Sequence, residues 1–438
     1  MLVIGDSVFL SVTFAIMAYI AWAMAQNRTV TVSVTLVATF MYVFAMWIPA
    51  HLQLAGTLES KIVRAGVALP IQATELSHLA VRWAIELAVV ALAEWTVWRS
   101  AKARQISPVA SVVDRGGFEK RVALVLITIG AISTVVFPAP ALENRADAGQ
   151  GFETLMRTFL VVGLAYLAYY RCFNRPYLWV VFVFGIALLV ANNVRSPLLM
   201  VVCGLLAGEI ATGRIRRLRR LVAIALIVLV FVIAGAYMSN ARANATRHLG
   251  LTQGEVFSDT LANPWISAYE AGIDTLDGYR FSIRVAEVEH PRPSDLANVF
   301  LTFVPRDVWP EKPTALGPDL SAKYLGYKAA GQFLSPVGYL TLTLGSYPAA
   351  VLGLGIFALL AALAVRYGFR SFAYAIVLMI VLRFMLSGSS FDIYYGLTYL
   401  LTYLVGYSVV RTGDALRKVD RDRFKPVVIL QAQLSRAG

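Results

Sequence analysis

The chain has 438 residues, of which 58% are hydrophobic and 15% are charged. A soluble globular domain carries about 25% charged residues, so this composition excludes an ordinary soluble protein. The net charge of +13 would indicate a nucleic-acid partner in a soluble chain. In a membrane protein the same excess of Lys and Arg marks the cytoplasmic connections, so its placement along the chain decides what it means.

Apolar runs recur along the chain at lengths near the roughly 20 residues that cross a hydrocarbon core. They predict an all-α polytopic membrane protein with about 11 transmembrane helices and no nucleic-acid partner. The expected spans are Val8–Ala25, Val30–Ile48, Leu79–Trp98, Val122–Ala141, Leu155–Tyr170, Tyr177–Ala191, Leu198–Thr212, Leu221–Met238, Pro348–Val365, Phe372–Leu386 and Ile393–Val410.

The Lys and Arg residues of the short connections predict the orientation. The basic segments are 99–121, 171–175, 214–220, 366–370 and the tail from Arg411. All of them fall on one side of the expected bundle, and the positive-inside rule makes that side cytoplasmic. The N-terminus is therefore expected outside and the C-terminus inside.

This topology leaves one long segment on the outer side. The predicted units are an N-terminal bundle of eight spans (1–238), one large outer loop containing short helices (239–335), a re-entrant element with the C-terminal spans (336–410) and a basic cytoplasmic tail (411–438). The outer loop is the one substantial segment outside the membrane, so we expect chemistry or binding there.

The outer loop carries a helical pattern of its own. Apolar residues keep near-helical spacing from Trp265 to Glu289, which predicts a helix over that range. Two prolines at 291 and 293 end it, because proline removes a backbone donor and restricts the residue before it. A second, short apolar helix is expected at Asp295–Phe303.

Four charged residues share one stripe of the first predicted loop helix. Asp277, Arg280, Arg284 and Glu287 follow one another at steps of three and four residues. The stripe has two interpretations at this point. It is either a row of anion ligands or a set of ion pairs within the helix.

The segment Pro305–Pro313 reads PRDVWPEKP, and its three prolines hold it extended and stiff. It resembles the Pro-Arg-x-x-Trp-Pro-x-Lys-Pro stretch of bacterial O-antigen and capsule repeat-unit polymerases, the Wzy-type family. Arg195-Ser196, which opens a span, is similar to the Arg-Ser element of that family. Ser335–Gly345 resembles its Gly-rich re-entry into the membrane. Tyr339 is a departure, because the family commonly has Glu there, and the chain would then supply that group differently, from Glu287 or His290.

The resemblance implies a metal-independent glycosyltransferase, a multi-pass protein of the bacterial inner (plasma) membrane whose outer loop is periplasmic. Enzymes of this family join oligosaccharide repeat units on undecaprenyl pyrophosphate into a surface polysaccharide. The implied partners are the undecaprenyl-pyrophosphate-linked oligosaccharide, membrane lipids and a chain-length regulator, with no cofactor and no metal. Two other functions stay open: an O-antigen ligase acting on lipid A-core, and a polysaccharide transporter or flippase.

Chemistry of this kind needs a cationic seat for the pyrophosphate and a base for the acceptor hydroxyl. Arginine suits the seat because its planar guanidinium donates to two oxygens at once. The catalytic candidates are Arg306, Glu287, His290 and Asp307. The substrate-binding candidates are Arg195, Arg280, Arg284, Lys312, Trp309 and Arg383.

Several of these residues also have a purely structural interpretation. Arg306 could pair with a neighbouring carboxylate of its own loop, and Lys312 and Trp309 could anchor that loop at the membrane interface. Arg383, near the outer end of its span, could extend to the interface instead of contacting a substrate. Inside the third span, Arg82 and Glu86 are four residues apart and are expected to pair with each other.

The four histidines all fall in predicted outer segments. Those segments hold most of the residues outside the spans, so the shared side does not indicate a metal site. His290 alone is of interest, because it ends the charged stripe and an imidazole titrates in the range that suits a general base.

Overall fold

The computed structural model is helical throughout the part of the chain that it describes. The described residues are 2–26, 28–99, 117–136, 152–172, 175–191, 195–212, 222, 226, 229–230, 233–238, 240–241, 244, 251–262, 264–271, 274–297, 309, 316–326, 334–369 and 371–437. Every regular element within them is a helix, which confirms the expected all-α class for these residues.

Five helical stretches are long and apolar enough to cross a membrane. They are Ile4–Ala25 within α1 (Leu2–Ala25), Thr29–Leu54, α5 (Ala73–Arg99), α17 (Tyr347–Gly368) and Asp392–Leu416 within α19 (Ser390–Ala437). Further apolar helices are α6 (Phe118–Val136), α7 (Phe152–Tyr170), α8 (Pro176–Ala191), α9 (Arg195–Ala211) and α18 (Ala373–Ser387). The predicted span Leu221–Met238 is described only in part, at 222, 226, 229–230 and 233–238. The protein is a membrane-type helical protein, and the total of about 11 crossings stays a prediction.

The second long stretch is built from four consecutive helical pieces: η1 (Thr29–Val32), α2 (Ser33–Tyr42), the wide π turn η2 (Val43–Trp47) and α3 (Ile48–Leu54). Pro49 is the second residue after the π turn, and its missing N–H breaks the ordinary helical hydrogen-bond ladder there. At the other end, the Glu94 carboxylate of α5 accepts hydrogen bonds from the backbone N–H groups of Val34 (3.0 Å) and Thr35 (2.8 Å). These are first-turn donors that have no partner inside their own helix, so Glu94 caps α2.

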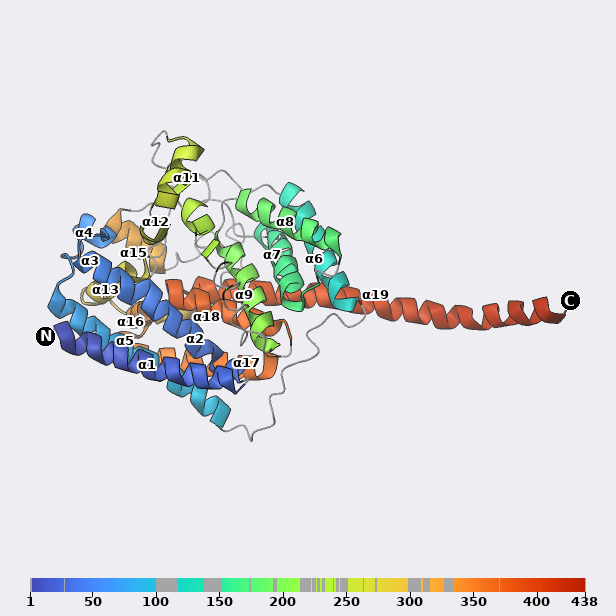
Figure 1. Cartoon of the computed structure of the whole chain (residues 1–438), viewed down its shortest axis with the longest axis horizontal. Helices are drawn as coiled ribbons and strands as arrows, with labels where there is room; N and C mark the ends of the chain where they lie inside the picture. The colour runs from blue at the N-terminus through green and yellow to red at the C-terminus, as the bar shows by residue number, and fades with distance from the viewer. Residues whose placement is uncertain are drawn as a thin grey trace.

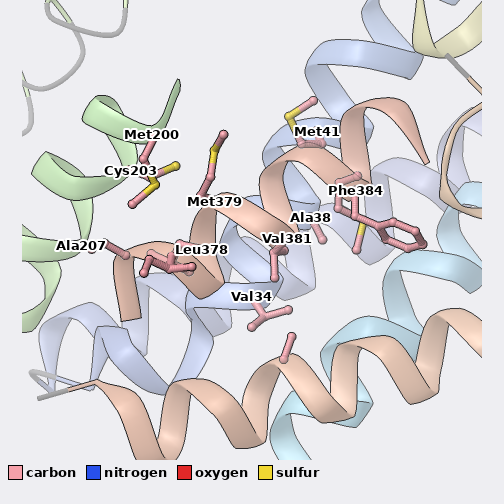
Figure 2. Close-up of a cluster of buried hydrophobic side chains, with 14 of the residues drawn as sticks. Val34, Ala38, Met41, Met200, Cys203, Ala207, Leu378, Met379, Val381 and Phe384 are labelled. Atoms are coloured by element: carbon pink, nitrogen blue, oxygen red, sulfur yellow. The ribbon is translucent and has the colours of Figure 1, made fainter. Parts of the chain in front are cut away.

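Helix α18 lies between α2 and α9 in the centre of the bundle (Figure 2). The side chains that meet there are apolar, and they include Met200 of α9 and the thioether side chains of Met41 and Met379. Cys203 is buried in this cluster as a small apolar group. The core of the bundle is therefore formed by helices from the start (α2), the middle (α9) and the last part (α18) of the chain.

The outer loop folds into short helices instead of the two predicted ones. They are α11 (Gln253–Ala262), α12 (Pro264–Ala271), α13 (Thr275–Ala286), the 3-10 turn η5 (Pro293–Ala297) and α15 (Leu316–Leu325). The predicted re-entrant element that follows the loop begins with α16 (Pro336–Leu344). The prediction of one helix over Trp265–Glu289 is wrong, because α12 ends at Ala271 and α13 begins at Thr275. In place of the expected helix at Asp295–Phe303, the described part forms only η5, and residues 298–303 lie outside the described range.

The polar ends of the long helices form two groups. At one end, which we call the loop end, α13 and α16 pack beside the start of α5 and the α18–α19 turn. At the opposite end Arg121 contacts Asp414 at 2.6 Å, and Arg366 donates to the carbonyl of Val97 at 3.0 Å. In Figure 1 the N-terminus, α13 and α16 lie at the left, while α19 continues far beyond the bundle at the right. The two groups match the sides assigned from charge, and which of them faces outward stays a prediction.

Candidate functional site

Helix α13 connects the outer loop to the bundle through three polar residues that reach three different elements. Asp277 Oδ1 accepts hydrogen bonds from Gln53 Nε2 (2.9 Å) and Ser60 Oγ (2.8 Å), between α3 and α4 (Lys61–Arg64). Two residues further along α13, the Tyr279 hydroxyl donates to Glu86 of α5 at 2.6 Å. Because these groups are buried, each hydrogen bond also satisfies a polar group that would otherwise be left without water.

Arg280 is the third of these residues, and it is 3% exposed. Its guanidinium donates to both carboxylate oxygens of Glu75, at 2.9 and 3.1 Å, and to the carbonyl oxygen of Leu69 at 2.7 Å. The expected ion pairs within the helical stripe are therefore wrong for Arg280 and Asp277, whose partners lie on other elements. A bidentate carboxylate partner neutralises Arg280, which makes it a framework residue.

The expected pairing of Arg82 with Glu86 is also wrong. Glu86 is fully buried, and its two oxygens accept from Tyr42 (2.8 Å) and Tyr279 (2.6 Å). Arg82 instead lies over the ring of Tyr347, with its Cζ 4.8 Å from the ring centroid, in the geometry of a cation–π contact.

A second polar cluster lies at the α18–α19 turn. Arg383 Nε donates to Asp392 Oδ1 at 2.9 Å, and the guanidinium lies 4.4 Å from the ring centroid of Tyr395. The other carboxylate oxygen of Asp392 accepts from the backbone N–H of Ser389 at 3.1 Å and from the hydroxyl of Ser387. Asp392 is 1% exposed, so Arg383 is held by a buried counter-charge.

Asp295 joins this turn to the outer loop. It accepts hydrogen bonds from the Tyr339 hydroxyl of α16 (2.8 Å), from Ser390 Oγ (3.4 Å) and from the backbone N–H of Leu316 at the start of α15 (3.0 Å). Tyr339 is the position at which the chain departs from the family pattern. The structure places the Asp295 carboxylate directly against the Tyr339 hydroxyl.

Two glycines permit close contacts that seat the loop. Gly345 has φ +84° and ends α16, and a Cβ there would lie 2.7 Å from Pro291 of the outer loop. Gly388 has φ +59°, and a Cβ there would lie 1.8 Å from the carbonyl oxygen of Ser335. Any side chain at these two positions would separate the segments that now pack together.

The surface of the loop carries an ion-pair group that clips α15 to the end of α13. Glu289 contacts Lys323 and accepts from the Tyr324 hydroxyl at 2.6 Å, while Arg292 bridges Glu289 and Asp319. The hydrogen bond from Lys323, followed by that from Tyr324, lowers the pKa of Glu289 to about 2. The backbone of Arg292 also donates to the carbonyl of Leu342 in α16 at 3.0 Å.

The predicted site residues fall into three groups. Arg284, Glu287 and His290 are exposed on the loop, and their side chains make no hydrogen bond or ion pair with the described residues. Arg280 and Arg383 are buried at the loop end in carboxylate pairs. The motif residues Arg306, Asp307 and Lys312 lie outside the described residues, Trp309 is half-buried, and Arg195 is the first residue of α9.

The structure adds two carboxylates that the sequence analysis did not single out, Asp295 and Asp392. Asp392 directly precedes the predicted span Ile393–Val410, and Asp295 begins the predicted short apolar helix of the loop. An unpaired charge is costly beside apolar segments, and this could have marked both. Among the described residues, no group of three or more His, Cys, Asp or Glu side chains is placed to hold a metal ion.

Comparison of the chain with protein-family models, with curated proteins and with solved structures gives no match. The class that the fold defines is therefore the broad one, an all-helical membrane-type protein with a folded loop docked on one end of its bundle.

Proposed function

We propose that the protein polymerises undecaprenyl-pyrophosphate-linked oligosaccharide repeat units at its loop end, on the periplasmic face of the bacterial inner membrane. The observation that supports this most is the gathering of arginines where the outer loop docks. Arg82, Arg280, Arg292 and Arg383 come from α5, α13, the outer loop and α18, and all lie around this junction. The segment PRDVWPEKP, which resembles the polymerase motif, belongs to the same loop.

In the proposed reaction, an acceptor hydroxyl forms a bond to the anomeric carbon of the donor glycan. The bond from that carbon to the pyrophosphate oxygen breaks, and the lipid pyrophosphate leaves as an anion. A base on the loop takes the hydroxyl proton. Preplaced cations at the leaving group stabilise the charge that develops there.

The contacts separate candidate residues that hold the structure together from candidate residues that could contact the substrate. Arg280 and Arg383 hold the loop end together, because each is paired with a buried or half-buried carboxylate. Arg306 and Arg195 are the proposed pyrophosphate seat, with Lys312 and Trp309 beside it in the same segment as Arg306. His290 and Glu287 are the proposed bases, with Asp307 as their rival, and the exposure of the first two leaves them open to a substrate hydroxyl.

The test is a reaction with purified protein and lipid-linked repeat units alone. We expect a ladder of longer lipid-linked chains, formed without nucleotide sugar and in the presence of a chelator. Arg306→Ala should abolish the ladder while the protein still inserts and accumulates, and Arg306→Lys should restore it only partly, because an ammonium lacks the two-pronged contact. Arg64→Ala is the matched control, since Arg64 is an exposed arginine of another outer segment paired with Glu59.

The alternatives give different products in the same assay. A ligase would form no ladder and would pass the glycan to lipid A-core when that acceptor is added. A transporter or flippase would leave the glycan unchanged in length with either acceptor. Full activity of Arg306→Ala would contradict the proposed role of the proline segment.

A further inference from the structure

Arg82 has no carboxylate partner among the described residues, and unlike Arg284, which also has none there, it lies on a predicted span. Arg280, Arg292 and Arg383 each pair with an acidic side chain. For Arg82 the nearest acidic group in its helix, Glu86, is occupied by two tyrosine hydroxyls. The charge of Glu86 acts on Arg82 through space, but the two side chains form no salt bridge. The N–H donors of the guanidinium can therefore contact an external anion.

The surroundings of Arg82 hold its side chain in place. The ring of Tyr347 covers one face of the guanidinium, and the Tyr347 hydroxyl donates to the Arg82 carbonyl oxygen at 3.4 Å. The N–H donors around the edge of the guanidinium make no hydrogen bond with the described residues. A stacked guanidinium with a free edge is the arrangement that binds phosphate oxygens in pairs.

An apolar surface begins directly below Arg82. Ile85 and Leu92 of α5 are 46% and 58% exposed, and Leu352 and Ile356 of the adjacent α17 are 66% and 51% exposed. We call this surface the α5–α17 seam. A lipid whose headgroup contacts Arg82 can therefore lay its hydrocarbon chain along the seam without crossing a polar surface.

The depth of Arg82 fits a headgroup position. Arg82, Ile85, Leu92, Trp95 and Arg99 recur at helical spacing, so they lie on one stripe of α5. Arg82 and Arg99 are about 26 Å apart along the axis at 1.5 Å per residue, close to the roughly 30 Å thickness of a hydrocarbon core. Arg82 thus stands at headgroup level at the loop end, and Arg99 at the opposite end.

The site also adjoins the segment that carries a candidate base. Tyr347 begins α17 two residues after Gly345, against which Pro291 packs, and His290 is the residue before Pro291. An anion at Arg82 would therefore lie beside the docked outer loop, whereas the contact of Arg99 with the described residues is its stack on Trp95, at 4.8 Å. This difference favours a substrate lipid over the bulk phospholipid that either end would meet.

We propose that Arg82 and the α5–α17 seam form a lateral docking site for the pyrophosphate headgroup and prenyl chain of the lipid-linked donor. The identity of the lipid rests on the proposed function, while the site itself rests on the contacts above. Donor would enter from the outer leaflet beside α5 and reach the loop end with its pyrophosphate already bound.

The test measures binding without turnover. Full-length protein in nanodiscs of zwitterionic phospholipid is titrated with a sugar-free polyprenyl pyrophosphate. We expect Arg82→Gln to weaken binding about tenfold or more, as the loss of a charge-assisted, two-pronged contact implies. Arg82→Lys should keep part of the affinity. Arg99→Gln is the matched control and should bind within about twofold of the wild type, since Arg99 stacks on an aromatic ring at the same 4.8 Å distance.

Three outcomes would overturn the proposal. Unchanged binding by a folded Arg82→Gln, or equal losses in Arg82→Gln and Arg99→Gln, would exclude the site. If the protein bound phosphatidylglycerol as tightly as the polyprenyl pyrophosphate, Arg82 would be a general contact for anionic lipids. If it bound inorganic pyrophosphate as tightly, the α5–α17 seam would contribute nothing to binding. Arg82-dependent binding without any ladder in the polymerisation assay would instead refute the proposed function and leave the site standing.

Discussion

The two ends of the helical bundle handle charge in different ways. At the opposite end, Arg121 and Asp414 form a pair with side chains 44% and 36% exposed, within reach of water and salt. At the loop end, Asp392, Glu86 and Asp295 are each almost fully buried and receive several donors from different elements. Exposed ion pairs contribute little to folding stability. Buried pairs fix the geometry of the groups around them, and removing one partner strongly destabilises the fold because the other charge is left buried alone. The opposite end also holds a buried carboxylate, Glu209, which pairs with Arg171. The loop end is therefore distinguished by the number of different elements that its buried carboxylates join.

The largest expected effect comes from removing a buried counter-charge. Asp392→Asn leaves Arg383 without its carboxylate, and we expect a loss of about 3–5 kcal/mol in unfolding free energy. Asp414→Asn, which breaks the exposed pair with Arg121, should cost under about 1 kcal/mol. Thermal unfolding of the purified variants in detergent compares the two directly. Equal shifts in the midpoint would remove the distinction between the ends.

A smaller effect should separate the loop from the bundle. Tyr279→Phe and Tyr42→Phe each delete one hydrogen bond to the buried Glu86, at a cost of about 1–3 kcal/mol. Only Tyr279 belongs to the outer loop, so only Tyr279→Phe should loosen it. We expect protease cleavage inside the loop to become about tenfold faster in Tyr279→Phe and to stay unchanged in Tyr42→Phe. Identical cleavage patterns would mean that α13 does not anchor the loop.

The surface clip of α15 should respond to pH. The pKa of Glu289 is lowered to about 2 from its ordinary value of 4.5, so its contact with Lys323 stabilises the folded loop above pH 4.5 and is lost as the pH falls toward 2. Hydrogen exchange of α15 should therefore be faster in Glu289→Gln than in the wild type at pH 7. The two should converge at about pH 2–3. Glu287→Gln, an exposed neighbour without a partner among the described residues, should match the wild type at every pH.

These contrasts also show which features were predictable from the sequence. The long apolar helices were predictable from the sequence, because hydropathy and length are local properties that decide whether a segment can span a bilayer. The break between Ala271 and Thr275 was not, because apolar spacing continues across it. Helical spacing predicts on which face of a helix a side chain lies, but it does not predict which residue of another element contacts that side chain.

The same limit explains the errors in the charged residues. Arg280 was expected either to bind an anion or to pair within its helix, and its partner Glu75 lies in a distant part of the chain. Arg82 and Glu86 have the spacing of a helical ion pair. Glu86 is buried, however, and its carboxylate accepts hydrogen bonds from two tyrosines of other helices. Asp295 gained its role only because α16 and the α18–α19 turn meet it in space. Motif likeness pointed to Arg306 and Lys312 by residue type alone, and their contacts stay predictions.

The central claim is that the loop end faces outward and the basic opposite end faces the cytoplasm. Single cysteines at Gly254 of α11 and Gly413 of α19 test it most directly, because an added Cβ at either glycine meets nothing within 4 Å. The native cysteines, both buried, are first replaced by alanine. We predict that a membrane-impermeant maleimide labels Gly254→Cys in intact spheroplasts and labels Gly413→Cys only after lysis. Labelling in the reverse order would place the loop end in the cytoplasm and contradict both the proposed function and the donor site.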